Sequence, residues 1–256
     1  MQRPPTDQTP PDAGPDAAPH WYAGPPFSEQ LFRHAVERAG GTMLPLLEPG
    51  GANDLDAVAK RIAARVDAAA GPVVLVGHGL AVPAVTRAAG LAGRNLRRLV
   101  LSNGPISRLD PFTRAFLRAG PCMPAALHPA LFLRWLASSA GLRRAVCNPY
   151  IMDRDTIDAI CRPLVASHGA RAAVATYLRS LCPLPEFVAS GVPTTLAWGD
   201  DDALYPLAEA DTADAIVGGG RVRAIPGGRY VPPEERPWAL ADLVLQACAT
   251  ARQPTP

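Results

Sequence analysis

Two residues that could perform acid–base chemistry follow apolar segments that we expect to be strands. Asp202 ends the acidic turn 200–202 after segment 194–198, and Tyr230 lies in the loop after segment 221–225. A carboxylate that is partly removed from water has a raised pKa, and a phenol donates a proton or a hydrogen bond. If the two side chains meet, they form either a pair suited to moving protons on a bound substrate or a structural pair that ties two loops together.

A third position of interest is Gly79, which we place on a sharp turn between a strand and a helix. Residues 73–76 are four consecutive apolar residues, typical of a strand covered on both faces, and residues 80–89 have a helical pattern. The backbone N–H of Leu80, at the start of this helix, could stabilise negative charge that develops on a substrate. We interpret His78 as a structural histidine that is hydrogen-bonded beside the sheet.

Strands and helices alternate along much of the chain, which predicts an α/β fold with a parallel sheet and right-handed crossovers. In such sheets ligands bind at the carboxyl ends of the strands, where Gly79, Asn103, Asp202 and Tyr230 all lie. We expect strands over residues 42–47, 73–76, 98–102, 194–198 and 221–225, and helices over residues 27–39, 80–89, 206–217 and 237–249, with one more after Asn53, which we expect to be its N-cap.

From residue 107 to residue 190 the strand patterns stop and helical patterns take over, which predicts an inserted helical cap. The apolar cluster around Trp135 is interpreted as the core of this cap, resting on the sheet domain and bordering a pocket. We therefore expect a disordered Pro-rich tail over residues 1–20, a core formed by residues 21–106 and 191–250, the cap over 107–190, and a short tail over 251–256.

Composition argues against several classes of function. The formal net charge is only +2 and there is no basic stripe with interleaved aromatic residues, so we expect no nucleic-acid or membrane partner. The 5 cysteines are widely spaced, without metal-ligand spacing, and the acidic turn 200–202 lacks the spacing of a calcium loop. We expect no metal and no cofactor, a reduced cytoplasmic setting, and a small molecule as substrate or ligand.

Four motifs, in the same order, resemble those of α/β-hydrolase-fold proteins over about residues 27–248. They are Val-Gly-His-Gly-Leu-Ala at 76–81, Leu-Val-Leu-Ser-Asn-Gly-Pro at 99–105, Trp-Gly-Asp-Asp-Asp-Ala-Leu-Tyr-Pro at 198–206 and Ile-Pro-Gly-Gly-Arg-Tyr-Val-Pro-Pro-Glu-Glu at 225–235. The resemblance implies a mostly parallel sheet with helices on both faces, in which the family's N-terminal strands are missing and residues 20–24 are the relic of an oxyanion loop. An edge left open in this way needs a cover, either the N-terminal segment, a protein partner or a second copy.

Within this family the catalytic groups follow the order nucleophile, acid, histidine, and the matching positions are Gly79, Asp202 and Tyr230. Of these three groups only the acid is retained. A shift of the match by one residue would place Arg229 at the histidine position in place of Tyr230, and arginine is no better a base. Glycine has no atom with which to attack, and a phenol of pKa about 10 is protonated at pH 7. Hydrolysis through a covalent intermediate is therefore disfavoured, and the resemblance implies a pseudo-hydrolase.

Our leading hypothesis from the sequence is a non-hydrolytic enzyme that promotes isomerisation, epimerisation or cyclisation of an apolar or natural-product-like substrate. Asp202 and Tyr230 would be its catalytic residues, and Gly79 the floor of its pocket. The alternatives are a catalytically inactive binding or scaffold protein, and a residual hydrolase that uses water directly. The other expected pocket residues are Leu80, His78, Asn103, Arg229 and Trp135.

Overall fold

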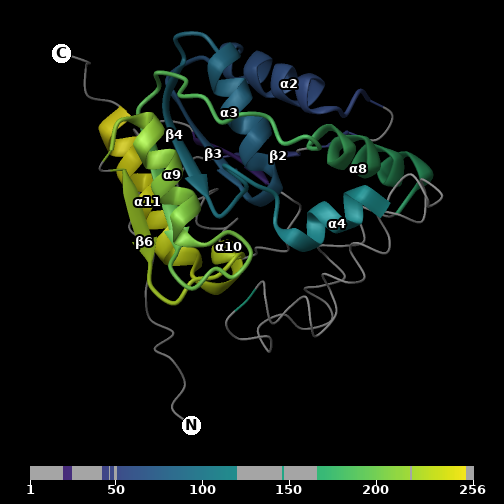
Figure 1. The fold of residues 1–256 in the computed structure, drawn as a ribbon. Helices are drawn as coiled ribbons and strands as arrows, with labels where there is room; N and C mark the ends of the chain where they lie inside the picture. The colour runs from purple at the N-terminus through teal and green to yellow at the C-terminus, as the bar shows by residue number, and fades with distance from the viewer. Residues whose placement is uncertain are drawn as a thin grey trace.

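A sheet of 6 parallel strands forms the centre of the computed structural model (Figure 1). The strands lie in the order β2-β1-β3-β4-β5-β6. They are β1 (His20–Gly24), β2 (Thr42–Pro45), β3 (Val73–His78), β4 (Leu96–Ser102), β5 (Thr194–Gly199) and β6 (Val222–Ile225). The structure describes residues 20–24, 42–45, 47–48, 51–119, 146, 166–219 and 221–251.

Helices occupy most of the described connections between successive strands, which is what allows neighbouring strands to run parallel. They are α2 (Leu55–Asp67), the short 3₁₀ turn η1 (Gly79–Ala81), α3 (Val82–Leu91), α4 (Pro111–Ala119), α8 (His168–Ser180), α9 (Leu207–Val217), α10 (Pro232–Glu235) and α11 (Pro237–Ala251). The predicted α/β class with a parallel sheet is confirmed, whereas the predicted helix over 27–39 lies outside the described residues.

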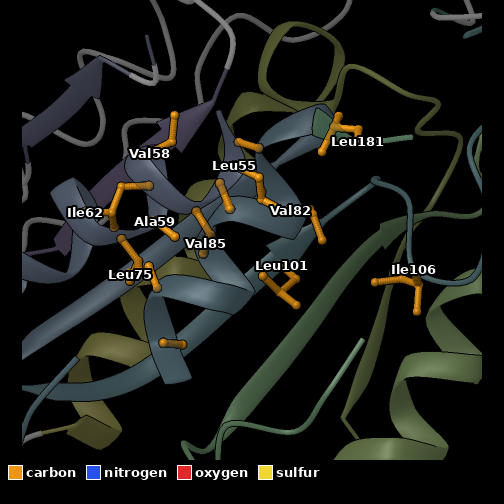
Figure 2. Packing of buried hydrophobic residues seen from close by; sticks show 14 of the residues in the cluster. Leu55, Val58, Ala59, Ile62, Leu75, Val82, Val85, Leu101, Ile106 and Leu181 are labelled. Atoms are coloured by element: carbon orange, nitrogen blue, oxygen red, sulfur yellow. The ribbon is translucent and has the colours of Figure 1, made fainter. Parts of the chain in front are cut away.

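Side chains of β3 alternate between two apolar cores, one on each face of the sheet. Leu75 belongs to the core formed with α2 and α3, where Ile62 and Val85 lie close to it (Figure 2). Val74 and Val76 point the other way, into a core formed with α11. Because both faces are covered by helices, every position of this strand favours a buried side chain, which accounts for its run of apolar residues.

The central strand β3 is longer than the sequence predicted, because it continues through Gly77 and His78 before the turn. A Cβ at Gly77 would lie 2.9 Å from Cβ of Val85 on α3. Glycine therefore permits α3 to approach the strand closely, since any side chain there would push the helix away. The close approach fixes the turn at Gly79 directly over the end of the sheet.

The helix after residue 53 begins one position later than expected, because its N-cap is Asp54 and not Asn53. The carboxylate of Asp54 accepts a hydrogen bond from the Ala57 N–H at 3.0 Å. The Asn53 side chain is buried and joins the preceding turn, where Nδ2 donates to the Glu48 carbonyl at 2.8 Å and Oδ1 accepts from the Glu48 N–H at 3.0 Å. Both residue types are good N-caps, so this tertiary contact decides between them.

Residues His20–Gly24 form a strand, so the interpretation of this segment as a loop relic is wrong, and His20 is not part of a tail. The strand pairs in parallel with β2 on one side and with β3 on the other. Pairing on both sides supplies the backbone hydrogen bonds that the segment's own pattern does not predict. β2 and β6 are then the edges of the described sheet, and a partner at an edge stays a prediction.

Among the described residues, helices α4 and α8 lie between β4 and β5, in the segment for which we predicted a helical cap (Figure 1). The bounds of that cap stay a prediction, and Trp135 lies outside the described residues. In the part of the chain that the structure describes, no helix combines the length and apolarity needed to cross a membrane.

Candidate functional site

The turn at Gly79 has the backbone geometry that a side chain would strain, and the space beside it is occupied. Gly79 has φ +58, in the left-handed region that glycine adopts without cost. A Cβ at this position would lie 2.6 Å from the phenol oxygen of Tyr230 and 3.2 Å from its Cζ. The phenol therefore fills the volume that a side chain at position 79 would take. Our expectation that Gly79 is the open floor of a pocket is thus wrong.

Tyr230 reaches this position from the loop after β6 and is only 7% exposed. Its ring lies 5.5 Å from that of His78 and 5.7 Å from that of Tyr205, centroid to centroid. Burial raises the pKa of Tyr230 far above its usual value, the charges of Asp110 and Asp202 add to the rise, and a hydrogen bond from the Leu80 N–H opposes it. The phenol is therefore neutral, and it lies near the N–H that we had assigned to a substrate.

Asp202 lies in the turn after β5 with 4% of its surface exposed. Its Oδ2 accepts from Nδ2 of Asn103 at 2.7 Å, and its Oδ1 accepts from the N–H groups of Leu204 at 2.8 Å and Tyr205 at 3.1 Å. Among the described residues these are its hydrogen bonds, and none joins it to Tyr230. Burial raises the pKa of Asp202 to about 6, while the three hydrogen bonds oppose the rise. Asp202 and Tyr230 are therefore not hydrogen-bonded to each other, and the negative charge of Asp202 acts on Tyr230 by disfavouring ionisation of the phenol.

Asn103 connects two strand ends to this carboxylate. It has φ 37, a left-handed conformation that asparagine tolerates better than most residues. Its Oδ1 accepts from the Gly199 N–H at 3.0 Å at the end of β5, while its Nδ2 holds Asp202. The expected pocket residue Asn103 is thus a fully buried structural link, whose role is to fix the position of the acid.

Arg229 lies apart from this buried group, which corrects its predicted place in the pocket. Its Nε donates to Oδ2 of Asp201 at 3.0 Å, and its Nη1 donates to the Val146 carbonyl at 3.4 Å. The Asp201 carboxylate is more than half exposed, so the guanidinium is drawn toward the surface and away from Gly79. Across the described ranges no group of three or more His, Cys, Asp or Glu side chains is arranged to hold a metal ion.

His78 is completely buried and agrees with the structural role expected for it. Its Nδ1 lies 3.1 Å from the carbonyl oxygen of Ser102 on the neighbouring strand. A carbonyl only accepts, so Nδ1 carries the hydrogen when the ring is neutral. Burial lowers the pKa of His78 to about 3, and the hydrogen bond to Ser102 opposes this only in part. The imidazole is therefore neutral at physiological pH, and its Nδ1 is hydrogen-bonded to the neighbouring strand.

The sequence did not identify three further buried polar residues near the turn, Asp110, Tyr177 and Tyr205. Asp110 accepts from the Tyr205 hydroxyl at 3.2 Å and from the Thr113 N–H at 3.0 Å, which makes it the N-terminal cap of α4. Tyr177, on α8, donates to the Leu80 carbonyl at 2.6 Å. The sequence contained one signal for these residues, because an aspartate directly before Pro111 is typical of a helix N-cap. Of these tyrosines and carboxylates, Tyr230 is the one that lies against Gly79.

The raised pKa of Asp202 predicts a specific pH dependence of stability. Because the folded state holds this proton more tightly than the unfolded state, the contribution of Asp202 to stability is complete below about pH 4 and is lost as the pH rises to about 6. The shift from 3.8 to about 6 corresponds to about 3 kcal/mol. Relative to Asp202→Asn, the wild-type free energy of unfolding should fall by about this amount between pH 4 and pH 7, measured by urea unfolding.

The matched control is Asp200→Asn, which removes a carboxylate from the exposed part of the same turn. If the curves for wild type and Asp202→Asn run parallel from pH 4 to pH 7, the prediction is wrong.

A parallel sheet, a strand–glycine–helix turn after β3 and an acid after β5, two strands away, are features of the α/β-hydrolase fold, and solved structures of this fold match nearly the whole chain. An α/β-hydrolase-fold protein from Burkholderia ambifaria matches 90% of this chain and 91% of its own with a TM-score of 0.69 and 20% identity. A thermophilic esterase from Thermogutta terrifontis matches 92% of this chain and 90% of its own, with a TM-score of 0.65 and 15% identity.

The esterase RhEst1 from Rhodococcus sp. ECU1013 is similar to the same extent, with a TM-score of 0.66 at 14% identity over 92% of this chain and 91% of its own. A scan against protein-family models and a search of curated proteins found no match. At these identities the likeness establishes the fold, and the chemistry has to be argued from the residues.

Proposed function

We propose that this α/β-hydrolase-fold protein carries out no covalent acyl transfer and acts instead by non-covalent binding. The observation that carries the proposal is the phenol oxygen of Tyr230, which lies 2.6 Å from the place of a Cβ at Gly79. A nucleophile at position 79 and the present position of Tyr230 exclude each other. A serine at position 79 therefore requires that Tyr230 move or be replaced as well.

Each group that acyl transfer needs has another role in this site. Gly79 offers no nucleophilic atom, and the phenol of Tyr230 holds its proton too tightly to act as a base. His78 is neutral, but its Nδ1 is bound to the Ser102 carbonyl inside the sheet. The Leu80 N–H, a natural oxyanion donor, lies close enough to the phenol to oppose the rise of its pKa. These contacts support a binding function over hydrolysis.

The isomerase or cyclase that the sequence favoured is the second candidate. One observation supports it, since a carboxyl group with a pKa of about 6 lies within electrostatic range of a phenol, and such a pair suits proton transfer near neutral pH. Substrate would reach the pair only if the Tyr230 ring left its present place over Gly79. Because that place is filled and buried, we rank this candidate below binding.

The experiment that tests the proposal restores the missing groups with Gly79→Ser and Tyr230→His together. The wild type should neither cleave p-nitrophenyl butyrate nor react with a fluorophosphonate probe. The double variant should gain both activities, because it restores a nucleophile and a base, and Asp202 is the carboxylate expected to orient the histidine. A control variant, Gly79→Ser with Tyr230→Phe, has the nucleophile but no base and should be about 100-fold slower or worse.

Ester cleavage by the wild type that disappears in Tyr230→Phe would overturn the proposal, because the phenol would then take part in hydrolysis. Product formation from a candidate isomerase substrate that depends on Asp202 would favour the second candidate.

A further inference from the structure

A pocket of about 330 Å³ lies on the side of α3 that faces α2, and none of the residues of the Gly79 site lines it. Its walls come from α2, from α3, from the turn after β4 and from the segment 185–190. This size is at the lower end of the range for small-molecule sites, and a concave site of this kind suits a small ligand better than a protein surface. The lining includes Pro83, Ile106, Phe187 and Val188.

Exposed apolar side chains gather around this pocket. In the described part of the chain the large apolar residues that are exposed are Leu91, at 51%, Val188, at 62%, and Ile216, at 43%. The first two line the pocket. Scattered exposed apolar residues need no explanation, but apolar residues that converge on a hollow mark a place where a ligand replaces water.

Gly90, the next-to-last residue of α3, leaves open space in the lining of the pocket. It lies inside α3 and lines the pocket, and a Cβ built there would meet no atom within 4 Å. Its backbone is helical, so neither a positive φ nor a close neighbour requires glycine. Glycine inside a helix costs about 0.5–1 kcal/mol relative to alanine. The structure therefore offers no local reason for this glycine other than the space that it leaves.

The α2 and α3 walls carry one positive charge that is not compensated. Arg87 is paired with Asp56, with Nε 2.6 Å from Oδ1. Lys60, one helical turn after Asp56, makes no hydrogen bond or ion pair with any described residue. Glu186 lies exposed on the segment 185–190. An anionic group would therefore be held at Lys60, with the apolar part of the ligand along α3.

We propose that this pocket binds a small amphipathic carboxylate, whose chain lies over Gly90 and Phe187 and whose carboxylate pairs with Lys60. The inference does not rest on the proposed function of the Gly79 site. Binding is non-covalent and uses side chains that the fold already places.

Calorimetric titration of the full chain with decanoate tests the proposal, with decanol as the uncharged probe. Gly90→Phe adds a ring at a position where the new Cβ meets no atom within 4 Å, and it should weaken decanoate binding about tenfold or more. Lys60→Gln should weaken binding of decanoate by about 2–5-fold, the worth of an exposed ion pair, and leave decanol unchanged.

The matched control is Gly71→Phe, at a glycine outside the pocket that also has no atom within 4 Å of a built Cβ, and it should bind decanoate like the wild type. If Gly90→Phe binds decanoate as tightly as the wild type, the proposed site is wrong.

If Lys60→Gln weakens the binding of decanoate and decanol equally, the assignment of the carboxylate to Lys60 is wrong. A concentration-dependent dimer that is lost in Gly90→Phe, without decanoate binding, would replace the ligand with a second copy. None of these three outcomes depends on whether the variant with Gly79→Ser and Tyr230→His cleaves esters, so the two proposals can fail separately.

Discussion

Gly79→Ala should lower the free energy of unfolding by about 3 kcal/mol, although it adds a single methyl group. The first part of the cost is backbone strain, since φ is +58 and an L-residue in that region loses about 1–2 kcal/mol. The second part is overpacking of about 1–3 kcal/mol, since the new Cβ would lie 2.6 Å from the phenol oxygen of Tyr230. Urea unfolding at pH 7 measures the sum.

A double-mutant cycle separates the two parts. Tyr230→Phe removes the phenol oxygen, so the closest atom to a Cβ at position 79 becomes Cζ at 3.2 Å. The cost of Gly79→Ala should therefore be smaller by about 1 kcal/mol in the Tyr230→Phe background. Gly71→Ala, where the added Cβ meets nothing within 4 Å, should change stability by less than about 0.5 kcal/mol. If Gly79→Ala costs the same in both backgrounds, the phenol does not fill the space at position 79.

His78 should make a contribution to stability that is lost in acid. The folded state holds this imidazole with a pKa of about 3, whereas the unfolded chain has the ordinary value of 6.5, so protons bind the unfolded state as the pH falls. The stability that the neutral ring provides is complete above pH 6.5 and is lost progressively toward pH 3. Between pH 7 and pH 4.5 the wild type should lose about 3 kcal/mol relative to His78→Gln, which does not titrate. Urea unfolding at both pH values gives this difference.

The effect of Asp202 on the free energy of unfolding is opposite to that of His78 over the same pH range. The two single variants can therefore be compared directly. From about pH 6 down to about pH 4 the raised pKa of Asp202 adds stability while the lowered pKa of His78 removes it. The wild type should therefore change little through these two groups, and each single variant should reveal the slope of the other. His168→Gln, at an exposed position, is the control and should match the wild type. If His78→Gln also matches the wild type, the imidazole does not stay neutral in the fold.

The local pattern of the sequence determined the elements that carry the site. The apolar run at 73–76 and the helical pattern after it placed Gly79 on a strand-to-helix turn, and the motif at 198–206 placed Asp202 at a strand end. These features depend on residues within a few positions of each other, and backbone sterics and apolar periodicity act over that range. The strand at His20–Gly24 was missed because its stability comes from pairing on both sides.

Only the tertiary structure decided what surrounds Gly79. The sequence predicted that Tyr230 lies at the carboxyl ends of the strands. The direction of its side chain depends on packing against His78 and Tyr205. Asp110 and Tyr177 join the same site from α4 and α8, elements far apart along the chain, with no spacing that relates them to Gly79. Long-range contacts of this kind are set by how layers of the fold pack together, which no local pattern encodes. That is why the sequence predicted an empty floor where the fold places a phenol.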